Sequence, residues 1–330
     1  MTSVISQYQK TLNRMGWSML LFMGLFYICS AISDICQPSP ESGLVYTALG
    51  GLISSFFYMA PFFLAGIFFL FLSRRTVTER LDLTVRLPRE FPLLIFAGLA
   101  VLSAGAFINA YFCEMIGYRI PDSMILPESY DNPAAVVMYM TVALAPAFAE
   151  EFLFRGVFYT NLRPFGRSQA ILISALLFAL MHQNIGQLFY TFLAGIAMAL
   201  MYEMTGSIWC SVFFHMINNE ISALGDVLYY SSHGESAMLL LSILDGVTFI
   251  LGIASIIILL LYNKKRLVQT NSQNAGFFSG HRPAVNRHDQ LLTPTTVFKS
   301  LLTPGMIAFT TVTCVLMGMT WLIILVENLR

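Results

Sequence analysis

Residues 45–73 read VYTALGGLISSFFYMAPFFLAGIFFLFLS, a stretch with no Asp, Glu, Lys or Arg. A helix needs about 20 predominantly apolar residues to cross the hydrocarbon core of a bilayer. This stretch is long enough to do so, and it therefore predicts a transmembrane helix. The rest of the chain shows whether the helix is a single anchor or one of many.

The composition of the whole chain indicates an integral membrane protein. Of its 330 residues, 57% are hydrophobic and only 11% are charged, with a mean hydropathy of +0.71. Soluble domains carry about 25% charged residues, so this chain has too few charges to coat a water-facing surface. Its formal net charge is zero, which gives no general attraction to nucleic acid. We therefore expect the protein to lie in a lipid bilayer and to have no nucleic-acid partner.

Eight further apolar stretches are candidates for spans. The one that begins at residue 134 is longer than a span requires, and we expect it to tilt or to break near Gly156. The sequence therefore predicts an all-α, polytopic transmembrane helical bundle of about eight or nine spans. The further stretches are Trp17–Ser33, Phe91–Ile116, Ala134–Leu162, Ser168–His182, Gly186–Met204, Ser207–Leu224, Ala237–Tyr262 and Leu301–Val326.

The basic residues predict the orientation of the bundle. Loops rich in Lys and Arg face the cytoplasm, and in this chain such loops alternate with loops that carry mainly Asp and Glu. We therefore expect a multi-pass protein of the cell (plasma) membrane with a cytoplasmic N-terminus. The polar stretch 263–300 is expected to be a cytoplasmic linker. The basic loop residues are Lys10, Arg14, Arg74, Arg75, Arg80, Arg86, Arg89, Arg163, Arg167, Lys264, Lys265, Arg266, Arg282, Arg287 and Lys299.

Ionisable residues inside predicted spans are costly to bury and are functional candidates by default. Residues 149–156 read AEEFLFRG. Glu151 and Arg155 are four residues apart, the spacing at which an ion pair forms along a helix, and each makes the burial of the other tolerable. Glu150 points about 100° away around the helix and has no basic partner at that spacing. Its carboxylate is therefore available as a general base.

Two later spans carry further polar groups. Phe178 and His182 share one helix face, and His215 and Asn219 share another. The last two side chains can both donate hydrogen bonds toward one point, which is what an oxyanion requires. Counted at about 1.5 Å per residue from the predicted cytoplasmic ends, these groups lie at a depth similar to that of Glu150. We expect them to meet inside the bilayer.

The combined pattern resembles a known family. The pattern is Glu150-Glu151-x-x-x-Arg155, then Phe178-x-x-x-His182, then His215-x-x-x-Asn219. It is similar to the CPBP family of intramembrane endopeptidases, also called the Abi or type II CAAX prenyl endopeptidase family. The resemblance covers Ala134 to Leu224. It divides the chain into N-terminal helices (1–133), a CPBP/Abi-like catalytic core (134–224), and C-terminal helices with the polar linker (225–330).

The resemblance implies an activity and a role for each motif residue. It implies an intramembrane endopeptidase of the glutamic type, which hydrolyses peptide bonds of a membrane-associated peptide or protein. Glu150 and His182 would activate water, and His215 and Asn219 would stabilise the oxyanion. Glu151 and Arg155 would support the site or hold the substrate backbone. No metal or other cofactor is implied.

Other functions remain open at this point. Glu150, His182 and His215 offer one oxygen and two nitrogens, a set that a catalytic zinc ion accepts with an open position, so a zinc-dependent peptidase is an alternative. Bacterial relatives of the family are linked to immunity against bacteriocins, so a non-proteolytic immunity or binding protein of the same fold is another. A proton-coupled transporter is less favoured, because no inverted repeat is visible. The sequence does not identify the substrate, nor does it indicate recognition of a prenyl group.

Overall fold

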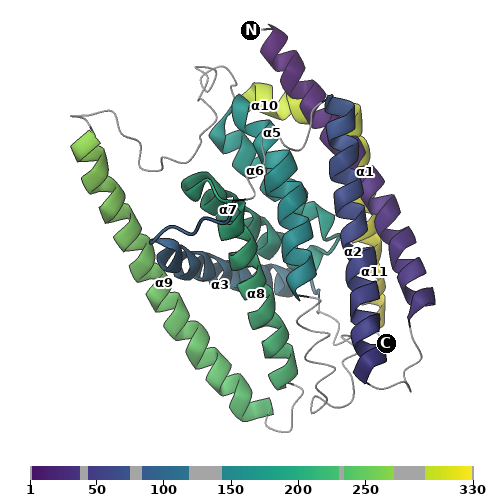
Figure 1. Ribbon diagram of the computed structural model, residues 1–330. Helices are drawn as coiled ribbons and strands as arrows, with labels where there is room; N and C mark the ends of the chain where they lie inside the picture. The colour runs from purple at the N-terminus through teal and green to yellow at the C-terminus, as the bar shows by residue number, and fades with distance from the viewer. Residues whose placement is uncertain are drawn as a thin grey trace.

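The described part of the protein is helical. The computed structural model describes residues 2–37, 44–74, 84–118, 143–229, 234–270 and 294–328, which are helices joined by short turns (Figure 1). No β-strand occurs among these residues. The all-α prediction is confirmed.

The helices follow one another in this order. Residues 143–151 form the helix that leads into the π-helix. The other elements are α1 (Thr2–Cys36), α2 (Leu44–Ser73), α3 (Phe91–Met115), a π-helix (Phe152–Tyr159), α5 (Thr160–Leu162), a 3₁₀ turn (Arg163–Phe165), α6 (Arg167–Met181), a 3₁₀ turn (Ile185–Gln187), α7 (Leu188–Thr205), α8 (Ile208–Tyr229), α9 (Gly234–Thr270), α10 (Pro294–Leu301) and α11 (Pro304–Asn328).

Six helical segments of the described residues are long and apolar enough to cross a membrane. They lie in α1, α2, α3, α7, α9 and α11, and α6 is a shorter apolar helix. The polytopic prediction is confirmed. The predicted span Ser207–Leu224 corresponds to α8. The predicted span Ala134–Leu162 corresponds to residues 143–162, because residues 134–142 lie outside the described part. The predicted linker is partly helical: α9 continues to Thr270, and α10 occupies its far end.

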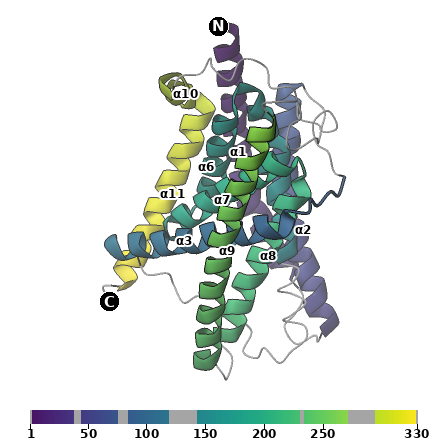
Figure 2. The same ribbon diagram turned by 90° about the vertical axis from the view of Figure 1, so that its left-hand side faces the viewer.

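The helices do not all run parallel. Helix α1 lies beside both α2 and α11, whereas α3 runs across α9 in both views (Figures 1 and 2). Close crossing of α1 and α11 depends on small residues: a Cβ on Gly16 would lie 2.1 Å from the Gly305 carbonyl carbon. The Gly305 N–H also donates to Asn13 Oδ1 over 2.7 Å. These contacts attach the last helix to the first.

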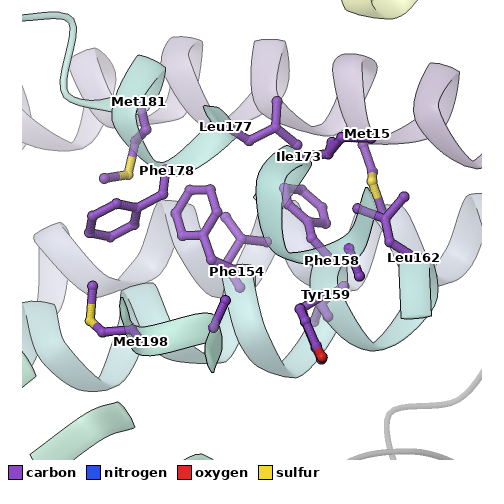
Figure 3. Packing of buried hydrophobic residues seen from close by; sticks show 14 of the residues in the cluster. Met15, Phe154, Phe158, Tyr159, Leu162, Ile173, Leu177, Phe178, Met181 and Met198 are labelled. Carbon is purple, nitrogen blue, oxygen red and sulfur yellow. The ribbon is translucent and has the colours of Figure 1, made fainter. Parts of the chain in front are cut away.

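The segment with the acidic motif lies at the centre of the core. Every residue from Phe152 to Tyr159 is buried. Phe154 and Phe158 pack toward Leu177 and Phe178 of α6 (Figure 3). Apolar side chains of α1 and α7 belong to the same cluster. Burial on several sides allows this segment to hold charged groups in a fixed geometry.

The sequence predicted a tilt or a break near Gly156, and no break occurs there. The helix instead widens into a π-helix over Phe152–Tyr159, and the Thr160 hydroxyl donates to the Arg155 carbonyl over 2.8 Å. π-Helical turns are rare and often mark functional sites. The widening lies directly after the two glutamates and includes Arg155. It therefore sets the direction of the Arg155 side chain relative to the two carboxylates.

Candidate active site

The predicted pair of Glu151 and Arg155 is present and completely buried. Arg155 Nη1 lies 2.7 Å from Glu151 Oε1, and both side chains are 0% exposed. Arg155 Nη2 also donates to the Gly195 carbonyl on α7 over 2.9 Å, and the guanidinium carbon lies 4.8 Å from the centre of the Phe178 ring. Arg155 therefore ties the π-helix to α6 and α7.

Gly195 is needed for this contact. A Cβ at this position would lie 2.8 Å from the Cα of Ala175 on α6. Small residues allow two helix backbones to approach closely. That approach brings the Gly195 carbonyl within reach of Arg155.

Glu150 is buried without a basic partner on its own helix, but it has a hydrogen-bond donor on α2. The Tyr58 hydroxyl donates to Glu150 Oε1 over 2.5 Å. The other oxygen, Oε2, is buried and has no hydrogen-bond partner among the described residues. It faces His215, whose Nε2 lies 3.9 Å away. One oxygen of this carboxylate is thus fixed, and the other remains free to accept a proton.

His215 on α8 lies between the two glutamates. Its Nδ1 is 3.1 Å from Glu151 Oε1, the same oxygen that binds Arg155. An ionised carboxylate only accepts hydrogen bonds, so Nδ1 carries the proton and Nε2 is directed toward Glu150. The carboxylate of Glu151 therefore fixes the ring orientation of His215.

His182 follows the last turn of α6. Its Nδ1 lies 2.8 Å from the Phe178 carbonyl oxygen. A carbonyl can only accept, so we assign the proton of the neutral ring to Nδ1, which leaves Nε2 as an acceptor. The Phe178 ring packs against both imidazoles, with its centre 4.9 Å from that of His182 and 5.8 Å from that of His215. The predicted shared face of Phe178 and His182 is confirmed.

A small cavity joins three of the predicted site residues. It has a volume of about 50 Å³, and His182, His215 and Asn219 are among its lining residues. A water molecule needs roughly 10–15 Å³ measured in this way, so the cavity has room for water. Apolar side chains of α3, α6, α7 and α8 form much of the remaining wall, including Leu102, Phe178, Ala194, Met198 and Phe214.

The two asparagines of α8 differ in their bonding. Asn218 Oδ1 accepts from the Tyr190 hydroxyl over 2.7 Å. Asn219 Nδ2 lies 3.4 Å from the Ala143 carbonyl, which is longer than an ordinary N–H···O bond of about 2.7–3.2 Å. The Asn219 amide is therefore only loosely held and can turn to a ligand in the cavity.

The described part of the site does not have the arrangement of a metal centre. Among the described residues, no three His, Cys, Asp or Glu side chains are placed to hold one metal ion. Glu150 Oε2 and His215 Nε2 are 3.9 Å apart, and His215 Nδ1 is already bonded to Glu151. The predicted zinc set of Glu150, His182 and His215 is not assembled in this arrangement, so we assign no chemical step to a metal.

The sequence alone did not indicate Tyr58 or Tyr190 as part of the site. Tyr58 lies in an aromatic, apolar helix with no charge pattern that marks it. Tyr190 likewise lies in an apolar stretch, at the start of α7, with no charged residue beside it. Asn218 did carry a signal, because an amide inside a predicted span is unusual.

The comparisons with known proteins agree with the motifs. Residues 132–221 match a family model described as type II CAAX prenyl endopeptidase Rce1-like. No curated protein and no solved structure gives a significant match to the chain. The matched segment contains all six predicted site residues and ends within α8, so α1, α2, α3, α9 and α11 lie outside it. Residues 132–221 of this multi-pass membrane protein are therefore similar to the Rce1-like, type II CAAX prenyl endopeptidase family.

Proposed function

We propose that this chain is a glutamate-dependent intramembrane endopeptidase, with Glu150 as the general base. One observation carries the proposal: the free oxygen of Glu150 faces His215, which lines one small cavity together with His182 and Asn219. The site thus places two imidazoles and an amide donor around space for water. The carboxylate of Glu150 is not among the lining residues, and it adjoins this space through His215. Peptide hydrolysis needs these groups, because a proton must leave water and negative charge must be stabilised on the substrate.

In the first step Glu150 and His182 activate a water molecule. Glu150 Oε2 takes a proton from the water, and Nε2 of His182, an acceptor in the assigned tautomer, orients it. The water oxygen bonds to the carbonyl carbon of the scissile peptide. The proton held by Glu150 then passes to the leaving nitrogen as the C–N bond breaks, so the carboxylate is regenerated.

His215 and Asn219 stabilise the oxyanion of the tetrahedral intermediate. Asn219 supplies its loosely held amide N–H groups. His215 can donate from Nε2 only when that nitrogen also carries a proton, because its Nδ1–H is directed to Glu151. In that form the ring is an imidazolium, and the ionised carboxylate of Glu151, 3.1 Å from Nδ1, offsets its charge. The arrangement favours charge stabilisation in the transition state.

Glu151 and Arg155 have a supporting role. Neither side chain is exposed, and both are bonded to the protein's own groups. A substrate backbone cannot reach Arg155 without breaking its contacts to Glu151 and Gly195. We therefore assign these two residues to positioning His215 and the π-helix, rather than to holding the substrate.

The substrate class follows from the location of the site. The catalytic groups lie on buried helices of a multi-pass protein, so the substrate is a membrane-associated peptide or protein segment. The start of α1, α5 with the following turn, and α10 lie at the same end of the molecule (Figure 1). These elements carry Lys10, Arg163 and Lys299. This grouping of basic residues supports an orientation in the plasma membrane in which that end of the molecule faces the cytoplasm.

A labelling experiment tests the orientation. Cys36 is exposed at the far end of α1 and should react with a membrane-impermeant maleimide in intact cells. The Cys36→Ser protein shows which part of the signal comes from this residue. Labelling of Cys36 only after the cells are opened would reverse the orientation.

A comparison of membrane proteomes tests the function. Cells that express the wild type are compared with cells that express Glu150→Gln at the same level, and new protein C-termini are identified by mass spectrometry. The proposal predicts membrane-protein fragments that occur only with the wild type. An identical set of C-termini, combined with a phenotype that Glu150→Gln rescues equally well, would instead support a non-proteolytic immunity or binding protein.

A further inference from the structure

We propose that Tyr58 is a positioning residue for Glu150, supplied by α2 from outside the segment that matches the protease family. Its hydroxyl donates to Glu150 Oε1 over 2.5 Å, and among the described residues this is the hydrogen bond that holds this oxygen. The inference rests on the proposed role of Glu150 as general base. It assigns part of the active site to the N-terminal helices.

The Tyr58 ring is itself fixed by other rings. Its centre lies 5.8 Å from that of Phe26 on α1 and 5.3 Å from that of Phe62 on α2. Phe22 contacts both of these phenylalanines, with ring centres 5.6 and 4.6 Å apart. The hydroxyl is therefore held in place by packing of α1 against α2. Phenylalanine at position 58 would keep this packing and remove only the donor.

The donor acts on the carboxylate in two ways. It binds Oε1, so the carboxyl plane is fixed and Oε2 is directed toward His215. It also stabilises the ionised form, because a hydrogen bond to a charged acceptor favours the charge. A general base must be ionised to accept a proton from water, so both effects favour the reactive state.

Other groups around Glu150 do not replace Tyr58. His215 on α8 faces the opposite oxygen at 3.9 Å, and Nδ1 of His182 on α6 is bonded to the Phe178 carbonyl oxygen. Glu151 and Arg155, on the same helix as Glu150, are bonded to each other. Among the described residues, Tyr58 is thus the group that donates to Glu150 at hydrogen-bond distance.

The test compares Tyr58→Phe with the wild type, Glu150→Gln and a matched control. The control is Tyr8→Phe, because the Tyr8 hydroxyl is buried on α1 without a hydrogen-bond partner among the described residues. All four proteins are purified in detergent. Each is assayed from pH 5 to pH 9 with a quenched peptide that spans a bond found cleaved in the proteome comparison.

We expect Tyr58→Phe to lower kcat by about 10- to 100-fold, the range for a modestly misplaced reacting group, with KM unchanged. The shape of its pH–rate profile should change, because the hydroxyl no longer donates to the carboxylate that accepts the proton. Tyr8→Phe should keep the wild-type kcat and profile. Melting temperatures should be alike for all four proteins.

The outcomes separate this proposal from the proposed function. An active Glu150→Gln protein would overturn both. An inactive Glu150→Gln protein together with a Tyr58→Phe protein of wild-type kcat and pH profile would overturn the role of Tyr58 alone. A Tyr58→Phe protein that melts earlier and loses activity equally at every pH would also overturn it, because Tyr58 would then be structural.

Discussion

Nδ1 of His215 lies 3.1 Å from Oε1 of Glu151, an oxygen that also binds Arg155 at 2.7 Å. One carboxylate oxygen therefore accepts from two donors, His215 on α8 and Arg155 on the π-helix. It balances the buried charge of Arg155 and fixes the ring of His215. Loss of Glu151 should for this reason affect both stability and catalysis.

The first prediction separates the two adjacent glutamates. Glu151→Gln removes the charge that balances Arg155, and loss of one partner of a buried pair typically costs about 3–5 kcal/mol. We expect a clearly lower melting temperature in detergent and a lower kcat. Glu150→Gln should keep the melting temperature, since its amide is cheaper to bury than a charge.

A second ion pair provides the control for that measurement. Glu203 binds Arg163 over 2.7 Å, but both side chains are 13% exposed. Glu203→Gln should lower the melting temperature less than Glu151→Gln, because partly solvated pairs contribute less. Equal melting temperatures for Glu150→Gln and Glu151→Gln would contradict this division of roles.

The second prediction concerns the oxyanion donors. Negative charge on the substrate oxygen exists only in the transition state, so its donors affect rate more than binding. Asn219→Ala should lower kcat by about 100- to 1,000-fold, the cost of one such donor, with little change in KM. Asn219→Asp should be slower still, because a carboxylate repels the oxyanion.

The neighbouring amide is the matched control in this case. Asn218 is bonded to Tyr190, and Asn218→Ala should lower kcat less than Asn219→Ala does. The measurement is a substrate titration with each purified variant. Weaker affinity with unchanged kcat in Asn219→Ala would make Asn219 a substrate-binding residue and remove its oxyanion role.

The third prediction concerns the contact of α6 with α7. In Gly195→Ala the added methyl would meet Ala175 at 2.8–2.9 Å, and such overpacking typically costs about 1–3 kcal/mol. It would also displace the carbonyl that binds Arg155. We expect a lower melting temperature and lower activity.

Gly246 on α9 provides the comparison for Gly195. A Cβ there would meet nothing within 4 Å, so Gly246→Ala should leave the melting temperature unchanged or raise it, since alanine favours a helix by about 0.5–1 kcal/mol over glycine. If Gly195→Ala were as stable as Gly246→Ala, the close approach of α6 and α7 would not limit this site.

The fourth prediction addresses the zinc alternative. If Glu150 and His182 activate water directly, EDTA and 1,10-phenanthroline should leave the cleavage rate unchanged. Elemental analysis of the purified protein should then show no stoichiometric zinc. Loss of activity in chelator that added zinc restores would favour the zinc-dependent peptidase, because a catalytic zinc ion activates water by lowering its pKa to about 7.

Local sequence spacing was enough to predict part of this site. The pair Glu151–Arg155 and the contact of Phe178 with His182 both follow from a separation of four residues on one helix. The helical membrane fold follows from apolar stretches such as 45–73. These predictions succeeded because they depend only on the geometry of a single helix.

Contacts between distant segments were not predictable in the same way. Tyr58 and Glu150 are 92 positions apart, and His215 and Glu151 are 64 apart. Neither contact leaves a pattern in the sequence, because it depends on how whole helices pack. The π-helix over Phe152–Tyr159 replaced an expected break at Gly156, since no local signal distinguishes a widened helix from an ordinary one.

The central claim is that Glu150 is the general base, and it is tested most directly by the kcat of Glu150→Gln. Glutamine keeps the size of the side chain and its contact with Tyr58, but it cannot accept the proton of water. At equal melting temperature and with the same quenched peptide, we predict that kcat falls by at least about 100-fold. A well-folded Glu150→Gln protein that cleaves the peptide at the wild-type rate would contradict the account.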